Sequence, residues 1–256
     1  MAVRINPFTT RHALPDLLSL GSVPGHSGSG PSPQVDVVVV PKVFGPGEVR
    51  YVADVLDLVA REKQASESPI RIIALIENAR AIQDLREICS ASHYLDGLIF
   101  GAEDFARDLS LTRTPSLREF QYARSAITTA ARAANLSSCI DLVCTRFRGE
   151  GALEILESEC RDGKGMGFNG KQCIHPDQLD TVNRLFSPSE EEVEWAVRVS
   201  IASKKAEAQG RGSWTLDSKM VDAPVIGQAV AIVAKAERCD LDLGSLWKKW
   251  KHQEPE

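Results

Sequence analysis

The sequence predicts an α/β fold built around a parallel sheet. Three observations predict it: six short apolar runs, the helix-like segments that separate them, and the regular alternation of the two along residues 3–176. Strands that alternate with helices are joined by crossover connections, which make neighbouring strands parallel. Two architectures satisfy this pattern, a doubly wound open sheet and a (β/α) barrel.

The predicted strands are short and apolar. The run VVVVPKV at 37–43 is rich in β-branched residues, which is typical of a strand buried on both faces. The six predicted strands are VRIN at 3–6, VDVVVVPKV at 35–43, IRIIALIE at 70–77, LDGLIFG at 95–101, SSCIDLVC at 137–144 and KQCIHP at 171–176.

Helices are predicted between these strands, because apolar residues recur there at helical spacing. The predicted helices cover 45–65, 81–91, 116–135 and 151–161. A loop is predicted at 21–34, where Gly, Ser and Pro dominate.

The C-terminal part follows a different pattern. Residues 187–210 are predicted to form one long helix that begins with a capping box at Ser187. An irregular excursion is predicted at 210–222, followed by a last helix from Ala223. The polar tail beyond Asp240 is expected to be frayed.

The composition is that of a globular protein with one large core: 256 residues, 43% hydrophobic and 25% charged. The net charge of -5 gives no sign of the clustered basic surface that a nucleic-acid-binding protein presents, so no nucleic-acid partner is expected. No G-x-G-x-x-G follows the first strand and no GxxxxGK[ST] occurs, which argues against a nucleotide-binding open sheet.

The six cysteines form no CxxC pair, so reduced thiols in an intracellular compartment are expected. No apolar run reaches the roughly 18 residues that a membrane helix needs, so no membrane partner is expected. The start MAVRINPF does not have the pattern of a signal peptide, because Pro7 interrupts it early.

Charged and polar side chains gather where the predicted strands end. In parallel α/β folds the functional groups lie at the C-terminal ends of the strands. The candidates at these ends are Arg4, Asn6, Lys42, Glu77, Glu103, Asp104, Asp141 and His175.

Two carboxylates on successive strands predict a magnesium site. Glu77 ends the strand at 70–77, and Asp104 follows the strand at 95–101. Mg²⁺ prefers oxygen ligands and uses one or two protein carboxylates together with water and substrate oxygens. Zinc is not expected, because the chain has no HExxH and no cysteine-rich spacing. The alternative for each acid is a place at a helix start, where negative charge is favourable.

Six short motifs, in order between residues 3 and 229, resemble one family. The motifs are VRINP, VVVVPKV, IIALIENARA, LIFGAEDFARDLS, KGMGFNGKQCIHPDQL and SKMVDAPVIGQA. They are similar to segments of the HpcH/HpaI aldolase and citrate lyase beta-chain family, which includes citramalyl-CoA and malyl-CoA lyases. The resemblance implies a (β/α)8 TIM-barrel type of fold. It divides the chain into a barrel domain at 1–186 and a C-terminal helical extension and lid at 187–256.

The resemblance also implies roles for four residues. Glu77 and Asp104 would hold Mg²⁺, with Glu103 a neighbour rather than a ligand. Arg4 and Glu77 would bind the substrate, and Arg4 would also be catalytic. The guanidinium of Arg4 suits the substrate's carboxylate or carbonyl oxygens, because it offers a planar fork of donors. Asp222 would act as a catalytic acid/base from a lid that covers a neighbouring subunit's site.

Three of the candidates have a simpler interpretation. Asp222 is well placed to cap the helix that follows it. His175 is expected to be a strand-end residue fixed by Pro176, and Lys42 is expected either to assist an anionic ligand or to pair with a carboxylate. His175 and Lys42 are therefore left out of the catalytic set, whereas Asp222 is kept in it.

The implied activity is a Mg²⁺-dependent lyase that splits a carbon–carbon bond of a 3-hydroxyacyl-CoA of the citramalyl-CoA, malyl-CoA or citryl-CoA type. The products would be a keto acid and acetyl-CoA, and the protein would be a homo-oligomer, a trimer. Two alternatives stay open: a non-catalytic member of the family that binds a CoA ester or pairs as a subunit with a full-length homologue, and an aldolase acting on free hydroxy keto acids. The Asp222 lid favours the CoA-dependent activity, because the shorter aldolases of the family lack it.

In the family, two strands precede the arginine strand, and the second ends in an acidic LEDAV-like segment. Here Met1 lies directly before the strand at 3–6. We therefore expect the first two βα units to be absent and the barrel to have about six strands. An intracellular location is expected, with the choice between mitochondrion and cytoplasm left open.

Overall fold

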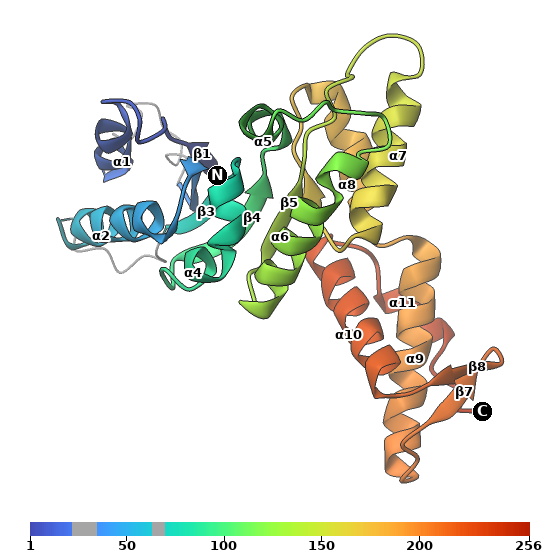
Figure 1. Ribbon diagram of the computed structural model, residues 1–256. Helices are drawn as coiled ribbons and strands as arrows, with labels where there is room; N and C mark the ends of the chain where they lie inside the picture. Colours follow the sequence, from blue (N-terminus) through green and yellow to red (C-terminus); the bar gives the residue numbers. More distant parts are fainter. Residues whose placement is uncertain (22–34, 63–69) are drawn as a thin grey trace, which may run out of the picture. The chain divides into compact units, whose positions relative to one another are not determined.

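The computed structural model describes residues 1–21, 35–62 and 70–256 (Figure 1). The chain forms two compact units, Met1–Leu179 and Asp180–Glu256. The loop predicted at 21–34 lies outside the described residues except for Gly21, the last residue of a helix. In the described part of the chain, no helix is long and apolar enough to span a lipid bilayer.

The first unit is a curled half-barrel of six parallel strands (Figure 1). The strands are β1 (Ala2–Arg4), β2 (Val37–Val43), β3 (Arg71–Ile76), β4 (Leu95–Phe100), β5 (Ser138–Asp141) and β6 (Gly170–Lys171). They lie in the order of the sequence, with β1 and β6 at the edges, and every neighbouring pair is parallel. The predicted α/β fold of TIM-barrel type with six strands is confirmed. A doubly wound sheet is excluded, because its strand order would reverse.

Helices follow each strand of this unit. They are α1 (Ala13–Gly21), α2 (Pro46–Glu62), α3 (Ala79–Gln83), α4 (Leu85–Cys89), α5 (Ala102–Leu109), η1 (Arg118–Phe120), α6 (Gln121–Ala133), α7 (Ala152–Gly165) and η2 (Pro176–Gln178). α2 packs on β2 and β3, α6 packs on β4 and β5, and α4 contacts both helices. Figure 1 shows α2, α4 and α6 following one another along the same side of the sheet.

Successive side chains of a strand point to opposite faces, and the two faces of this sheet are buried to different degrees. Val38, Ile72 and Leu98 are completely buried. On the other face a smaller cluster forms, whose outer members are only partly buried. This cluster consists of Ile73, Leu75 and Ile99, with Val37, Val39 and Ile140 packed against it.

Several predicted elements of the first unit are shorter or divided in the structure; the strand predicted at 137–144, for example, is only Ser138–Asp141. The helix predicted at 81–91 is divided at Asp84 into α3 and α4. The strand predicted at 171–176 pairs with β5 only over Gly170–Lys171. Beyond it the chain turns into η2, which begins at Pro176, a residue that has no N–H to donate to a strand ladder.

The second unit is mainly helical. Its elements are α8 (Leu179–Phe186), whose first residue belongs to the first unit, α9 (Glu190–Ala208), β7 (Trp214–Leu216), β8 (Lys219–Val221), α10 (Ala223–Arg238) and α11 (Gly244–Lys249). α9 packs against α10 through small and branched residues, with Ala196, Val199 and Ala229 completely buried between them.

The start of α9 and the segment after it differ from the prediction. Ser189, and not Ser187, caps the helix, with Ser189 Oγ accepting from Glu192 N at 3.1 Å and Glu192 Oε2 accepting from Ser189 N at 2.8 Å. The excursion predicted to be irregular at 210–222 contains an antiparallel hairpin of β7 and β8.

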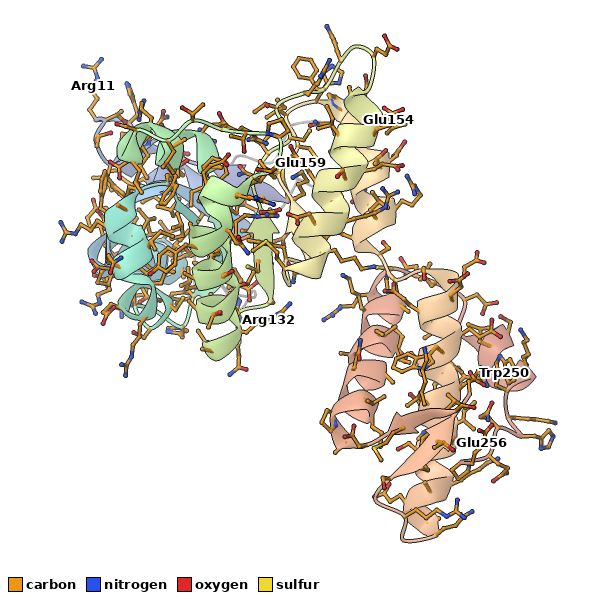
Figure 2. All side chains as sticks on the ribbon, turned by 45° about the vertical axis from the view of Figure 1, so that its right-hand side comes forward. Arg11, Arg132, Glu154, Glu159, Trp250 and Glu256 are labelled. Atoms are coloured by element: carbon orange, nitrogen blue, oxygen red, sulfur yellow. The ribbon has the colours of Figure 1, made fainter. Side chains whose placement is uncertain are left out.

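The tail beyond Asp240, predicted to be frayed, is folded onto the unit. Trp250 Nε1 donates a hydrogen bond of 2.7 Å to Glu194 Oε1. Glu256 and Thr215 exchange two backbone hydrogen bonds of 3.0 Å. Trp250 and Glu256 are labelled in Figure 2. The prediction was wrong because the aromatic side chains of α11 have apolar surface to bury against α9.

Candidate active site

Three neighbouring strands end at one edge of the half-barrel and supply Lys42, Glu77 and Asp104. Lys42 lies near the end of β2, Glu77 directly follows β3, and Asp104 lies in the first turn of α5, which follows β4. Ile76 takes part in the last ladder pair of β3 with each neighbour, so the three strands end at one level. The sequence prediction that Glu77 and Asp104 come from adjacent strand ends is therefore confirmed.

Glu77 is held by the backbone of β2. Its side chain is 8% exposed, and its Oε2 accepts a hydrogen bond of 2.7 Å from Lys42 N. Lys42 has a φ of 52°, and the pairing of β2 with β3 shifts register between Val40 and Val43. A bulge of this kind re-aims a backbone group, and here the N–H of Lys42 is directed at the Glu77 carboxylate instead of at the sheet.

Gly101 makes room for the Glu77 side chain. A Cβ at position 101 would lie 2.5 Å from Glu77 Cγ and 2.8 Å from Glu77 Oε1. Gly101 N also donates to Ile76 O at 2.9 Å, which fixes the start of α5 beside the end of β3. Any larger residue here would push the carboxylate out of its position.

Asp104 is paired with two cations. Its Oδ1 lies 2.6 Å from Arg107 Nη2 and its Oδ2 lies 3.5 Å from Lys42 Nζ. The Arg107 side chain is 74% exposed, and those of Lys42 and Asp104 are about one third exposed. Partly exposed ion pairs contribute little free energy, so Asp104 can exchange these partners for a stronger cation.

The charge of Glu77 is disfavoured by its surroundings. Burial raises the pKa of this carboxyl above its usual value, and the neighbouring charge of Asp104 raises it further. The hydrogen bond from Lys42 N and the charges of Lys42 and Arg4 act in the opposite direction without cancelling the increase in pKa. Two carboxylates that repel each other form a site that a divalent cation stabilises.

Glu103, although adjacent to Asp104, turns to a different cation. Its Oε1 lies 2.5 Å from Arg113 Nη1, and Arg113 Nη2 donates to Glu159 Oε1 at 3.0 Å. Glu159, which is labelled in Figure 2, belongs to α7. It also forms an ion pair with Lys171, whose Nζ lies 3.0 Å from Glu159 Oε2. This network separates Glu103 from the pair formed by Glu77 and Asp104.

Asp141 does not join the strand-end site. It is completely buried and accepts from Arg124 Nε at 3.0 Å and from Arg124 Nη2 at 2.7 Å. Arg124 lies on α6 and also contacts Asp162 of α7. This carboxylate therefore fixes helices to the sheet and is not free for a ligand.

Asn6 and His175 also have structural partners. Asn6 donates to Asp16 Oδ2 from both its backbone N and its Nδ2, at 2.8 Å each. His175 caps η2 through Asp177 N at 3.3 Å and stacks on Phe147 with ring centroids 5.1 Å apart. His175 thus has structural contacts, but it caps η2 four residues beyond the end of β6 and does not end a strand.

The two residues expected to be catalytic lie in different units. Arg4 is exposed at the end of β1, and its charge reaches Glu77, whose pKa it lowers. Asp222 belongs to the second unit, where it caps α10 by accepting from Val225 N at 3.3 Å. The cap interpretation is confirmed, and the catalytic role of Asp222 stays a prediction.

Sequence reasoning missed three residues of the site. Arg107 and Arg113 provide counter-charges, and Gly101 provides space. The separation of Asp104 and Arg107 by three positions on a helix was a readable signal for their ion pair. The contact between Gly101 and Glu77 has no such signal, because it joins different strands.

The residues at this edge fit a hard divalent cation. Within the described residues, no group of three or more His, Cys, Asp or Glu side chains could hold a metal. Mg²⁺ does not need such a group, because one or two carboxylates suffice when water and substrate oxygens complete the shell. Glu77 and Asp104 provide the two carboxylates; Glu77 Oε2 accepts from Lys42 N, and Glu77 Oε1 lies against Gly101.

A family model described as HpcH/HpaI aldolase/citrate lyase matches residues 29–176. The mitochondrial citramalyl-CoA lyase of Rattus norvegicus is 32% identical over 207 residues, which cover 78% of this chain and 60% of that protein. The chain thus spans about three fifths of the length of that relative. The citrate lyase subunit beta of Haemophilus influenzae is 32% identical over 235 residues, which cover 92% of this chain and 76% of that protein.

A solved structure of similar fold is that of the protein CitE from Mycobacterium tuberculosis in complex with magnesium, acetoacetate and coenzyme A. It superposes with a TM-score of 0.68 at 29% sequence identity, and the match covers 92% of this chain and 78% of that chain.

Proposed function

The chain belongs to the HpcH/HpaI aldolase/citrate lyase family, and from this premise we propose that it acts as a Mg²⁺-dependent carbon–carbon lyase on a 3-hydroxyacyl-CoA. The substrates are of the citramalyl-CoA, malyl-CoA or citryl-CoA type, and the products are a keto acid and acetyl-CoA. The observation that carries the proposal is the pair formed by Glu77 and Asp104 at adjacent strand ends, with cationic Lys42 beside it.

Glu77 and Asp104 are the residues that hold the metal in this proposal. When bound, Mg²⁺ supplies a Lewis acid for the oxygens of the keto-acid half. Arg4 binds and orients the same half, because its planar guanidinium matches a carboxylate. Glu77 binds this half of the substrate as well, through the metal that it holds.

Cleavage breaks the bond between the carbon that carries the hydroxyl group and the α-carbon of the thioester. The hydroxyl proton passes to solvent water, the hydroxyl oxygen becomes the keto oxygen, and the electron pair of the broken bond passes to the α-carbon. Asp222 protonates the resulting enolate and so completes acetyl-CoA. No electron is gained or lost overall, which means that no redox cofactor is required.

The relatives support this choice of substrate class and partner. A citramalyl-CoA lyase is among the similar proteins, and CitE was solved with magnesium, a keto acid and coenzyme A. We include a homo-oligomer, a trimer, in the proposal, with Asp222 acting at a neighbouring subunit's site. A mitochondrial or cytoplasmic location is likewise part of the proposal.

The test is to incubate the protein with citramalyl-CoA and to follow pyruvate and acetyl-CoA together. Equal amounts of the two products are expected with Mg²⁺, and neither with EDTA. Glu77→Gln is expected to lose the activity, whereas Glu87→Gln, an exposed acid on α4, is expected to keep it. Cleavage that continues in EDTA, or release of free CoA without a keto acid, would contradict the proposal. Turnover of free hydroxy keto acids alone would favour the aldolase alternative.

A further inference from the structure

Lys42 contacts both carboxylates of the candidate metal pair, each through a different part of the residue. Its backbone N donates to Glu77 Oε2 at 2.7 Å, and its Nζ lies 3.5 Å from Asp104 Oδ2. The two acids belong to different strand ends, and one residue of a third strand connects them.

The backbone contact depends on an uncommon conformation. A φ of 52° at Lys42 lies in the left-handed region, which a lysine adopts only when its surroundings enforce it. The register shift between Val40 and Val43 enforces it here. This backbone conformation directs the Lys42 N–H at Glu77 independently of the position of the Lys42 side chain. The backbone contact with Glu77 and the ammonium contact with Asp104 can therefore be tested separately.

The ammonium contact, in contrast, is exchangeable. The Lys42 side chain is 34% exposed and ends on a flexible stem, and it approaches only one oxygen of Asp104. A divalent cation that binds Asp104 would lie next to this ammonium, and the two positive charges would repel each other. Metal binding therefore requires the ammonium to move away from Asp104.

After it leaves Asp104, the ammonium of Lys42 remains at the edge of the half-barrel where β2, β3 and β4 end. Arg4 ends β1 and Lys42 lies near the end of the neighbouring β2, so both cations lie at the strand-end edge that carries Glu77. A keto acid that binds a metal on Glu77 and Asp104 brings a carboxylate to this position. An ammonium on a flexible stem suits such an anion as a movable point charge.

We propose that Lys42 is an exchangeable counter-ion: it neutralises Asp104 in the metal-free protein, yields this carboxylate to the metal, and then binds the carboxylate of the keto-acid half of the substrate. This inference rests on the proposed function, because it needs the metal pair and an anionic ligand. It adds that Lys42 weakens the binding of the metal and strengthens the binding of the keto acid.

Opposite effects on metal and keto acid form the test. In Lys42→Met, calorimetric titration with MnCl₂ is expected to show binding that is several-fold tighter than in the wild type, because the competing cation is gone. Titration of the Mn²⁺-saturated protein with pyruvate is expected to show binding weakened by about tenfold, which is typical for the loss of one charge-assisted contact. Damage to the fold would instead weaken both.

Lys42→Gly separates the backbone role from the ammonium. Glycine accepts a positive φ without strain and keeps the N–H directed at Glu77, so this variant should reproduce both effects of Lys42→Met. Arg80→Met, which removes an exposed cation of α3 that pairs with Asp84 at the end of this helix, should change neither affinity. Melting curves establish that all variants are folded.

Each outcome tests a different part of the proposal. Unchanged or weaker Mn²⁺ binding in both Lys42 variants overturns the counter-ion role, and unchanged pyruvate binding overturns the role in substrate binding. If Glu77→Gln binds Mn²⁺ like the wild type, the metal pair itself is refuted, and the role of Lys42 with it. If Glu77→Gln loses Mn²⁺ while the Lys42 variants behave like the wild type, only the inference about Lys42 fails.

Discussion

At the scale of single residues, Glu77 carries an energetic cost that a metal would relieve. Burial raises the pKa of its carboxyl in the folded protein above the value in the unfolded chain. The charged form therefore destabilises the metal-free protein at neutral pH, and this cost disappears as the pH falls through the raised pKa. A buried carboxyl group with a raised pKa is a common feature of functional sites.

Glu77→Gln is accordingly expected to raise the melting temperature of the metal-free protein at neutral pH. The amide removes the buried charge, and its oxygen can still accept from Lys42 N. The difference between variant and wild type should shrink as the pH is lowered, because wild-type Glu77 then becomes protonated. Mg²⁺ should raise the melting temperature of the wild type and not that of the variant. Circular dichroism melts in EDTA and in MgCl₂ measure both effects, and a lower melting temperature of the variant in EDTA would contradict them.

At the scale of elements, the junction of β4 and α5 positions the carboxylates. Gly101→Ala places a methyl group about where the Glu77 side chain lies. We expect a loss of about 1–3 kcal/mol in the free energy of unfolding from overpacking. We also expect metal affinity to fall by roughly 10–100-fold, the usual effect of disturbing the support of a ligand.

Gly47→Ala is the matched control for this variant. Gly47 lies in α2, and a Cβ at this position would meet no atom within 4 Å. Alanine should therefore be neutral or slightly stabilising there, because it favours the helix. Urea unfolding and Mn²⁺ titration of the two variants make the comparison. Equal behaviour of both variants would show that Gly101 does not determine the position of Glu77.

The sequence predicted elements well where one local pattern determines the outcome. The β-branched run of β2 and the apolar run of β3 can be buried only as central strands, so both were predicted correctly. The start of α9 was misplaced because Ser187 and Ser189 each precede a glutamate by three positions, and local pattern does not choose between them. The structure chooses Ser189, from which the helix continues without interruption.

At the scale of the whole molecule, the topology explains why the site was partly readable from the sequence. Sequential parallel strands bring their carboxyl ends to one edge, so Glu77 and Asp104 could be paired from their positions alone. The partner of Asp141 could not be predicted in this way. Arg124 approaches it from the helix layer, and nothing in either segment distinguishes this buried carboxylate from one at the mouth of the site.

The ion pairs of the first unit fall into two kinds with different roles. The buried salt bridge of Arg124 with Asp141 joins α6 to the sheet, and Arg124 also pairs with the half-exposed Asp162 of α7. The strand ends instead carry partly exposed charges that can exchange partners, such as Lys42 and Asp104. A rigid scaffold that supports exchangeable charges is what a binding site for a metal and an anion requires.

The central claim is that Glu77 and Asp104 together bind one divalent cation, and Mn²⁺ binding measured by electron paramagnetic resonance tests it most directly. The wild type is expected to bind one Mn²⁺ per chain, and Glu77→Gln/Asp104→Asn is expected to bind at least about 100-fold more weakly. Asp54→Asn/Glu87→Gln makes the same change in charge at exposed helix positions and should bind like the wild type. Equal Mn²⁺ binding by Glu77→Gln/Asp104→Asn and the wild type would contradict the account.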